Sequence, residues 1–233
     1  RSNIFYGNEI CNTLSWNMIC GVDEAGKGPV IGPLVVAAVM VDNVKVLDDL
    51  GFKDSKLLTP IKRKELANVI RERFDYTIEV IETNLIDEYT QRNKLNKLNR
   101  EAFERVISKL NPNVAYVDAA DVNEKRFGKL IKLGLTNSND TDIISMHKAD
   151  AKITVVAAAS IIAKETREEK IKELKRKIGD FGSGYPSDKR TIKFLKAFYG
   201  VNSKWPPGTR KSWKTLKRIK PVKTLNDFGE KNE

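Results

Sequence analysis

Short apolar runs alternate with amphipathic segments along most of the chain. The apolar runs have the length and the β-branched content of buried strands, whereas the amphipathic segments repeat their apolar residues at helical spacing. The predicted strands are 17–22, 34–41, 76–82, 114–117 and 142–146. The predicted helices are a segment that begins at Pro60 and includes Phe74, then 95–110, 124–133 and 153–163. Strands that alternate with helices predict an α/β fold, with helices packed on a sheet.

The segment 153–163 is apolar nearly all round, and its alanine content favours a buried helix over a strand. The charged segment 165–178 alternates in sign and predicts an exposed continuation of that helix. After the Gly/Pro-rich stretch 182–186 the pattern resumes as short basic helices. We therefore expect a small helical C-terminal extension. The expected units are a peripheral segment 1–17, a main domain 18–180, a basic helical part 181–220 and a tail 221–233.

The net charge of +11 is concentrated at one end of the chain. The last 70 residues carry 20 Lys and Arg against 9 Asp and Glu, whereas the preceding 163 residues carry 22 of each sign. Such asymmetry indicates a basic surface for a polyanion, most simply a nucleic acid, although a charged helix face can also serve only for solubility. From Lys189 onward acids are scarce and aromatic residues lie among the bases, so nucleic-acid contact is the favoured interpretation there.

Composition excludes several other classes of protein. No apolar run approaches the ~18 residues of a transmembrane helix, so we expect no membrane partner. Cys11 and Cys20 are too few for a disulfide framework, which leads us to expect a cytoplasmic protein. We also expect a monomer.

A glycine-rich loop follows the first predicted strand, in the sequence GVDEAGKGP from Gly21 to Pro29. It resembles a nucleotide-binding loop, but Gly28 stands where a hydroxyl is needed for Mg²⁺, and Asp23 and Glu24 bring negative charge to the phosphate position. A strand that ends in two carboxylates beside a flexible turn suits a divalent cation bound by the acids and a substrate bound by the turn. One histidine and two cysteines argue against zinc, so Mg²⁺ or Mn²⁺ is the predicted ion.

Two further acids occupy comparable places. Asp118 follows the predicted strand 114–117, and Asp150 lies just before the buried helix 153–163. Carboxylates in these places can converge on one pair of metal ions, or each can be an ordinary acid at the end of an element. Spacing alone leaves both interpretations open.

The order of short motifs resembles the type 2 ribonucleases H, the ribonuclease HII family, and its archaeal branch in particular. The resemblance spans about residues 18 to 220. The motifs that carry it are GVDEAGKGP (21–29), DSK (54–56), YVDAA (116–120), HKADAK (147–152) with AASIIAK (158–164), GSGYPSD (182–188) and SWKT (212–215).

The resemblance implies a ribonuclease H-like mixed β-sheet flanked by helices. It implies an endoribonuclease that uses a two-metal site of Mg²⁺ or Mn²⁺ to hydrolyse the RNA strand of RNA–DNA hybrids and to cut 5′ of single ribonucleotides in duplex DNA, leaving 5′-phosphate ends. The catalytic and metal-binding residues that it implies are Asp23, Glu24, Asp118 and Asp150.

Substrate contacts also follow from the resemblance. The turn Gly26, Lys27 and Gly28 is implied to bind the ribose 2′-OH and the adjacent phosphate, although many members carry Arg at the position of Lys27. Tyr185 is implied to pack on the sugar at the RNA-to-DNA step and to bond the 2′-OH. Lys56 is implied to meet a backbone phosphate.

Two other residues compete for roles in this site. Asp121 becomes the ligand in place of Asp118 if the strand runs further, but the family match favours Asp118 and leaves Asp121 as a surface or capping acid. His147 lies three residues before Asp150, where it can transfer protons or serve a structural role.

Two other functions stay open from the residues alone. The first is a non-catalytic protein that binds nucleic acid through its basic C-terminal part. The second is another two-metal nuclease or strand transferase of the same fold.

Overall fold

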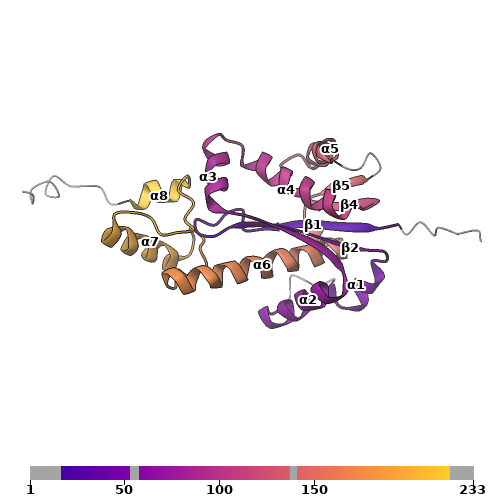
Figure 1. Ribbon diagram of the computed structural model, residues 1–233, viewed down its shortest axis with the longest axis horizontal. Helices are drawn as coiled ribbons and strands as arrows, with labels where there is room; N and C mark the ends of the chain where they lie inside the picture. The colour runs from indigo at the N-terminus through magenta and orange to yellow at the C-terminus, as the bar shows by residue number, and fades with distance from the viewer. Residues whose placement is uncertain (1–16, 53–57, 137–140, 221–233) are drawn as a thin grey trace, which may run out of the picture.

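Five strands form one mixed sheet in the computed structural model, which describes residues 17–52, 58–136 and 141–220. The sheet lies at the centre of the molecule (Figure 1). The strands are β1 (Ile19–Ala25), β2 (Leu34–Val41), β3 (Asp75–Ile81), β4 (Val114–Asp118) and β5 (Asp142–Met146). Their order is β3-β2-β1-β4-β5, with β2 antiparallel to β1 and β3, and with β4 parallel to β1 and β5. β1 is therefore the central strand, and its neighbour β4 runs in the same direction.

Helices precede or follow nearly every strand. They are α1 (Lys45–Asp49), α2 (Pro60–Arg73), α3 (Thr83–Gln91), α4 (Leu95–Leu110), α5 (Glu124–Gly134), α6 (Thr154–Ile178), α7 (Lys189–Asn202) and α8 (Lys214–Ile219), together with the 3₁₀ turn η2 (Ala149–Ala151). The predicted strands and helices are confirmed to within a few residues at each end. The sequence prediction missed α1, α3 and η2, and it ended β1 three residues too early.

The helices cover both faces of the sheet (Figure 1). One face packs on α6, α2 and α1 through a cluster that includes Val35, Val39, Ile70 and Val156. The other face packs on α3, α4 and α5 through a second cluster that includes Val22, Phe103 and Phe127. Because β1 and β2 lie between two apolar layers, most of their side chains are buried, as their continuous apolar runs predict.

Helix α6 is the long element that crosses the centre of the sheet. Its first half is buried and its second half carries alternating charges, so the predicted helix 153–163 and its charged continuation form one helix of 25 residues. α6 lies close against β1 because Gly21 has no side chain: a Cβ there would lie 2.2 Å from the backbone of Val155. Any larger residue at position 21 would push the helix off the strand that carries Asp23.

The C-terminal elements pack at one end of the sheet (Figure 1). A third apolar cluster joins Val30 and Ile31 from the loop after β1 to Ile171 of α6, Phe181, Leu195 of α7 and Leu216 of α8. A backbone bridge between Ile31 and Thr209 adds to this contact. The C-terminal part is thus joined to the loop that follows Asp23 and Glu24. Within the described ranges, no helix is long and apolar enough to cross a membrane.

Candidate active site

The carboxylates of Asp23 and Glu24 lie at the end of the central strand. Val22 of β1 pairs with Val117 of β4, so the next residues along the two parallel strands, Asp23 and Asp118, are neighbours. Side chains alternate along each strand, which directs Asp23 and Asp118 to the α6 face and Glu24 to the α4 face. Asp23 and Asp118 are therefore neighbours at the carboxyl ends of β1 and β4, and Glu24 follows Asp23 on the other face of the sheet.

The electrostatics of the three acids depend on burial. Asp23 is only 5% exposed. Burial, together with the nearby charge of Asp118, raises the pKa of Asp23 to about 7. Burial and the charge of Asp23 raise the pKa of Glu24 to about 8. Such raised values mean that a positive charge is needed before both groups can be ionised at neutral pH.

The fourth predicted acid, Asp150, lies in the 3₁₀ turn η2 between β5 and α6. Lys148 has a left-handed backbone with φ of 57°, which turns the chain sharply after β5. The amide of Ala149 then donates a 2.8 Å hydrogen bond to Oδ1 of Asp118. This contact holds the half-buried Asp150 segment against the end of β4.

The donor set fits a hard divalent cation, because carboxylate oxygens are its preferred ligands. Oε2 of Glu24 is buried and accepts no hydrogen bond within the described residues. In the same part of the chain, no three His, Cys, Asp or Glu side chains are already gathered tightly enough to hold one ion between them. The metal site at Asp23, Glu24, Asp118 and Asp150 therefore stays a prediction that the burial and the chemistry of these acids support.

The glycine turn 26–28 lies directly beyond these acids. Gly26 has φ of 92°, and a Cβ there would lie 2.6 Å from Nε of Arg167, so only glycine fits. A Cβ on Gly28 would lie 3.8 Å from the ring of Tyr185, which is half-exposed. Tyr185 therefore lies near the turn, and the substrate roles implied for both stay predictions.

The side chain of Lys27 points to the loop after β4. Its Nζ donates a 2.7 Å hydrogen bond to the carbonyl of Ala120. Lys27 therefore ties the glycine turn to the loop that follows Asp118. A lysine can make this single contact as well as an arginine can.

Helix α6 adds two cations that the sequence analysis did not single out. Lys164 is near enough to Asp23 to oppose the rise of its pKa. Arg167, one turn further along the helix, is buried and stacks on the ring of Tyr185 at 5.3 Å from its centroid. Ser160, earlier on the same helix, also acts on the pKa of Asp23. Positions 160, 164 and 167 lie on one face of a helix, and this spacing was the signal in the sequence.

The two competing residues have structural contacts. Asp121 accepts hydrogen bonds of 2.6 and 2.9 Å from Arg126, which lowers its pKa. The ring Nε2 of His147 lies 3.2 Å from the carbonyl of Val122, and its amide donates to Glu124. Asp121 is thus paired with Arg126, and its assignment as a surface or capping acid stays a prediction. Lys56, the predicted phosphate contact, lies outside the described residues.

Comparison with known proteins assigns the fold to the ribonuclease H-like class. The crystal structure of ribonuclease H2 from Pyrococcus horikoshii OT3 aligns with a TM-score of 0.81 and 44% identity, over 87% of this chain and 96% of that one. The ribonuclease HII of the PCNA:RNase HII complex from Archaeoglobus fulgidus aligns with a TM-score of 0.80 and 41% identity, over 90% and 100% of the two chains.

Sequence comparison narrows the class to one family. The family model "Ribonuclease HII" matches residues 20–216. Ribonuclease HII from Thermococcus onnurineus (strain NA1) is 47% identical over 206 residues, which cover 86% of this chain and 89% of the relative. The chain therefore belongs to the ribonuclease HII family. It is an endoribonuclease of the ribonuclease H type, with the mixed sheet and flanking helices expected from its sequence.

Proposed function

We propose that this enzyme hydrolyses the RNA strand of RNA–DNA hybrids and cuts on the 5′ side of single ribonucleotides in duplex DNA, leaving 5′-phosphate ends. The observation that carries the proposal is the adjacency of two features. The carboxylates of the buried Asp23 and the half-buried Glu24 end the central strand, and the turn 26–28, with Tyr185 near it, lies immediately beyond them. Such a site combines acids for catalysis with groups that can bind the sugar of the substrate.

Asp23, Glu24, Asp118 and Asp150 would hold the divalent cations, Mg²⁺ or Mn²⁺. When bound, two such ions supply Lewis-acid activation of the attacking water and of the leaving 3′-oxygen. The raised pKa values of Asp23 and Glu24 support this role, because acids that repel one another in a buried place are stabilised by a cation between them. Lys164 adds one positive charge beside Asp23.

The turn and Tyr185 would read the ribose. Backbone amides of residues 26–28 would bond the 2′-OH and the adjacent phosphate, and the ring of Tyr185 would pack on the sugar and bond the 2′-OH. The position of the Tyr185 ring, 3.8 Å from where a Cβ on Gly28 would lie, supports a shared role, and Arg167 stacks on the ring. A deoxyribose offers no hydroxyl to this pair, so specificity follows from hydrogen bonds that only the ribonucleotide makes.

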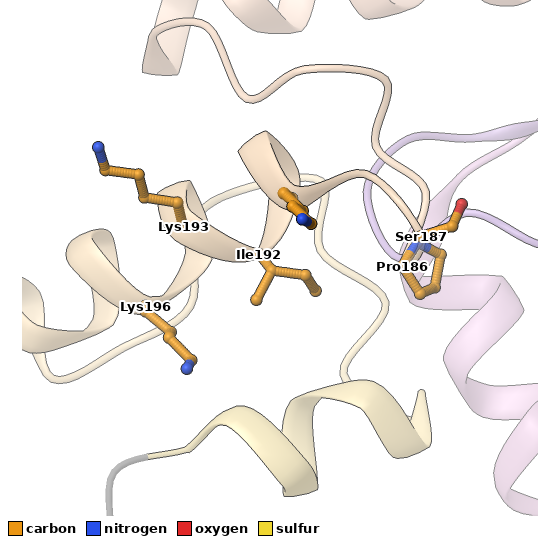
Figure 2. Close-up of a pocket in the computed structure, with 6 residues that line it drawn as sticks. Pro186, Ser187, Ile192, Lys193 and Lys196 are labelled. Atoms are coloured by element: carbon orange, nitrogen blue, oxygen red, sulfur yellow. The ribbon is translucent and has the colours of Figure 1, made fainter.

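The basic part 181–220 would hold the duplex backbone. A groove of about 410 Å³ lies where the loop after Tyr185 meets α7. Figure 2 shows Pro186 and Ser187 on the loop and Ile192, Lys193 and Lys196 on the helix; Lys189 completes the lining. Three lysines on one helix, next to Tyr185, suit the phosphates of a strand that continues past the ribonucleotide. All of these residues come from one chain, so the proposal needs no second subunit.

The direct test is a cleavage assay with the full chain. The substrates are an RNA–DNA hybrid, a DNA duplex with one ribonucleotide and the matching all-DNA duplex, each with a 5′-labelled strand and Mg²⁺ or Mn²⁺. We expect cleavage of the first two, a single cut 5′ of the ribonucleotide, and loss of activity with EDTA. Cleavage on the 3′ side, or equal cleavage of the all-DNA duplex, would contradict the proposal.

A further inference from the structure

The carbonyl groups of the glycine turn are all held from one side by the C-terminal segment. The guanidinium of Arg210 donates to three carbonyls: Nη2 to Gly26 at 2.6 Å, Nη1 to Lys27 at 2.9 Å and Nε to Gly32 at 3.0 Å. Nε1 of Trp213 donates to the carbonyl of Gly28 at 3.1 Å. Three consecutive carbonyls, from residues 26, 27 and 28, thus face the segment that contains Arg210.

This arrangement determines where the amides of the turn point. In a trans peptide the N–H of one residue is opposite the C=O of the residue before it, and the described chain has no cis peptide. Carbonyls 26 and 27 point toward Arg210, so the amides of Lys27 and Gly28 point away from it. Pro29 contributes no N–H. The two outward amides form a small anion-binding arrangement of the kind that successive backbone N–H groups make.

Arg210 is an unusual residue to bury. It is fully enclosed, and Arg167, only 5% exposed, is a second buried cation beside it. Burial and then the charge of Arg167 lower the pKa of Arg210. Nε and Nη2 of Arg167 have no hydrogen-bond partner among the described residues. Two cations enclosed under a turn destabilise each other, and a bound anion above the turn relieves that repulsion.

The segment that carries Arg210 is itself anchored to the sheet domain. The buried carboxylate of Asp87 on α3 accepts hydrogen bonds from the amides of Lys211 and Ser212, at 2.7 and 2.8 Å, and from the Ser212 hydroxyl. The guanidinium of Arg210 also stacks on the ring of Trp213, 4.8 Å from its centroid. Arg210 and Trp213 therefore form a rigid support under the turn.

We propose that Arg210 and Trp213 are positioning residues, which orient the amides of Lys27 and Gly28 toward a phosphate or hydroxyl of the ribonucleotide. The positive charges of Arg210 and Arg167 also attract that phosphate. The inference rests on the proposed function, because the ligand of the turn is the ribonucleotide of a duplex. Arg210 touches no substrate in this role. It acts through the backbone of the glycine turn.

The test uses Asp118→Asn as a non-cleaving background in the full chain, with Mg²⁺ present. Binding of a duplex with one ribonucleotide and of the matching all-DNA duplex is measured by fluorescence anisotropy. Arg210→Lys keeps the charge but loses the fork that reaches three carbonyls. Trp213→Phe keeps an aromatic ring beneath Arg210 and removes the Nε1 donor together with part of the indole ring system. Arg105→Lys, at an arginine that pairs with Glu79 on β3, is the matched control.

We expect Arg210→Lys to reduce the preference for the ribonucleotide duplex at least tenfold and Trp213→Phe to reduce it about threefold, while Arg105→Lys leaves it unchanged. In the cleaving enzyme, the same variants raise KM for the ribonucleotide duplex more than they lower kcat.

The inference is overturned if folded Arg210→Lys and Trp213→Phe proteins keep the full preference, or if both duplexes lose affinity equally. If the Asp118→Asn background itself shows no preference, the assignment of the turn as the ribose site fails instead. If the Arg210→Lys protein does not fold, the preference of the Trp213→Phe protein for the ribonucleotide duplex tests the inference.

Discussion

The amide of Ala149 donates a hydrogen bond to Oδ1 of Asp118, at 2.8 Å, and thereby joins the turn that carries Asp150 to the end of strand β4. One oxygen of Asp118 thus has a structural contact, in addition to the metal-binding role proposed for this carboxylate. The two roles can be separated by substitution.

Asp118→Asn keeps an oxygen for the Ala149 amide and removes the negative charge. We expect it to abolish hybrid cleavage in Mg²⁺ while the free energy of unfolding and the affinity for the hybrid change little. Asp118→Ala also abolishes cleavage, but it leaves the Ala149 amide without its partner and lowers the free energy of unfolding by about 1–3 kcal/mol. Chemical denaturation and a single-turnover cleavage assay measure the two effects. Near-normal turnover by Asp118→Asn would refute the role of this residue in catalysis.

Asp23 predicts a dependence of stability on pH. Its pKa is about 7 in the folded protein and near 3.8 when unfolded, so the folded state binds more protons between these values. Stability of the metal-free protein therefore falls as pH rises from about 4 to about 7, by on the order of 3 kcal/mol from this group. Asp23→Asn removes that slope and can keep the hydrogen bond that Oδ1 accepts from the Glu24 amide.

The measurement is the difference in unfolding free energy between the wild type and Asp23→Asn at several pH values in EDTA. We expect the wild type to lose stability relative to the variant as pH rises. Adding Mg²⁺ at pH 8 should restore the wild type more than the variant, because a ligand that binds only the folded state stabilises it. A difference that stays constant with pH would show that Asp23 is not a strained buried carboxylate.

The sheet and most helices were predictable because their apolar residues repeat at a regular spacing or because capping residues mark their ends. Thr59 caps α2 through the amide of Lys62, as the Thr-Pro pair indicates, and the apolar run 34–41 is strand β2 without a change of bounds. Helix α3 was missed because its residues 83–91 carry only a short apolar face. The positions of the acids at the strand ends could also be predicted, since each follows an apolar run.

The support of the glycine turn was not predictable. Arg210 lies among exposed bases, and nothing in the local sequence distinguishes a fully buried arginine from a solvated one. Its three carbonyl partners are more than 170 residues away in the chain, and the Asp87 anchor is more than 120 residues away. Contacts of this kind depend on tertiary packing, so a single sequence carries no periodic signal for them.

The basic groove on α7 predicts a salt-dependent contribution to binding. Replacing Lys189, Lys193 and Lys196 together with glutamine should weaken binding of the hybrid and reduce the slope of log affinity against log salt by about 2–3, because each phosphate contact contributes about 0.9 to that slope. Deletion of the chain after Gly200 is a poorer test, since it also removes the buried Arg210.

The matched control replaces Lys125, Lys129 and Lys132 on α5, which changes the net charge equally at a different pocket. Fluorescence anisotropy between about 50 and 200 mM salt measures both triple variants. We expect the α5 variant to keep the wild-type slope. Equal slopes for the two variants would mean that the α7 lysines act only through net charge.

Tyr185→Phe removes one hydroxyl from the ring that lies near Gly28 and keeps the stacking on Arg167. If that hydroxyl bonds the ribose 2′-OH, kcat/KM for the single-ribonucleotide duplex falls about tenfold, because the ribose loses a hydrogen-bond partner. Weak binding of the all-DNA duplex is unchanged, because deoxyribose has no 2′-OH. Tyr185→Ala should lower kcat/KM for the single-ribonucleotide duplex further, since it also removes the packing on the sugar. Competition between the two duplexes for the Phe variant measures the discrimination directly. An unchanged preference for ribose in a folded Tyr185→Phe protein would assign the recognition to the backbone amides of the turn alone.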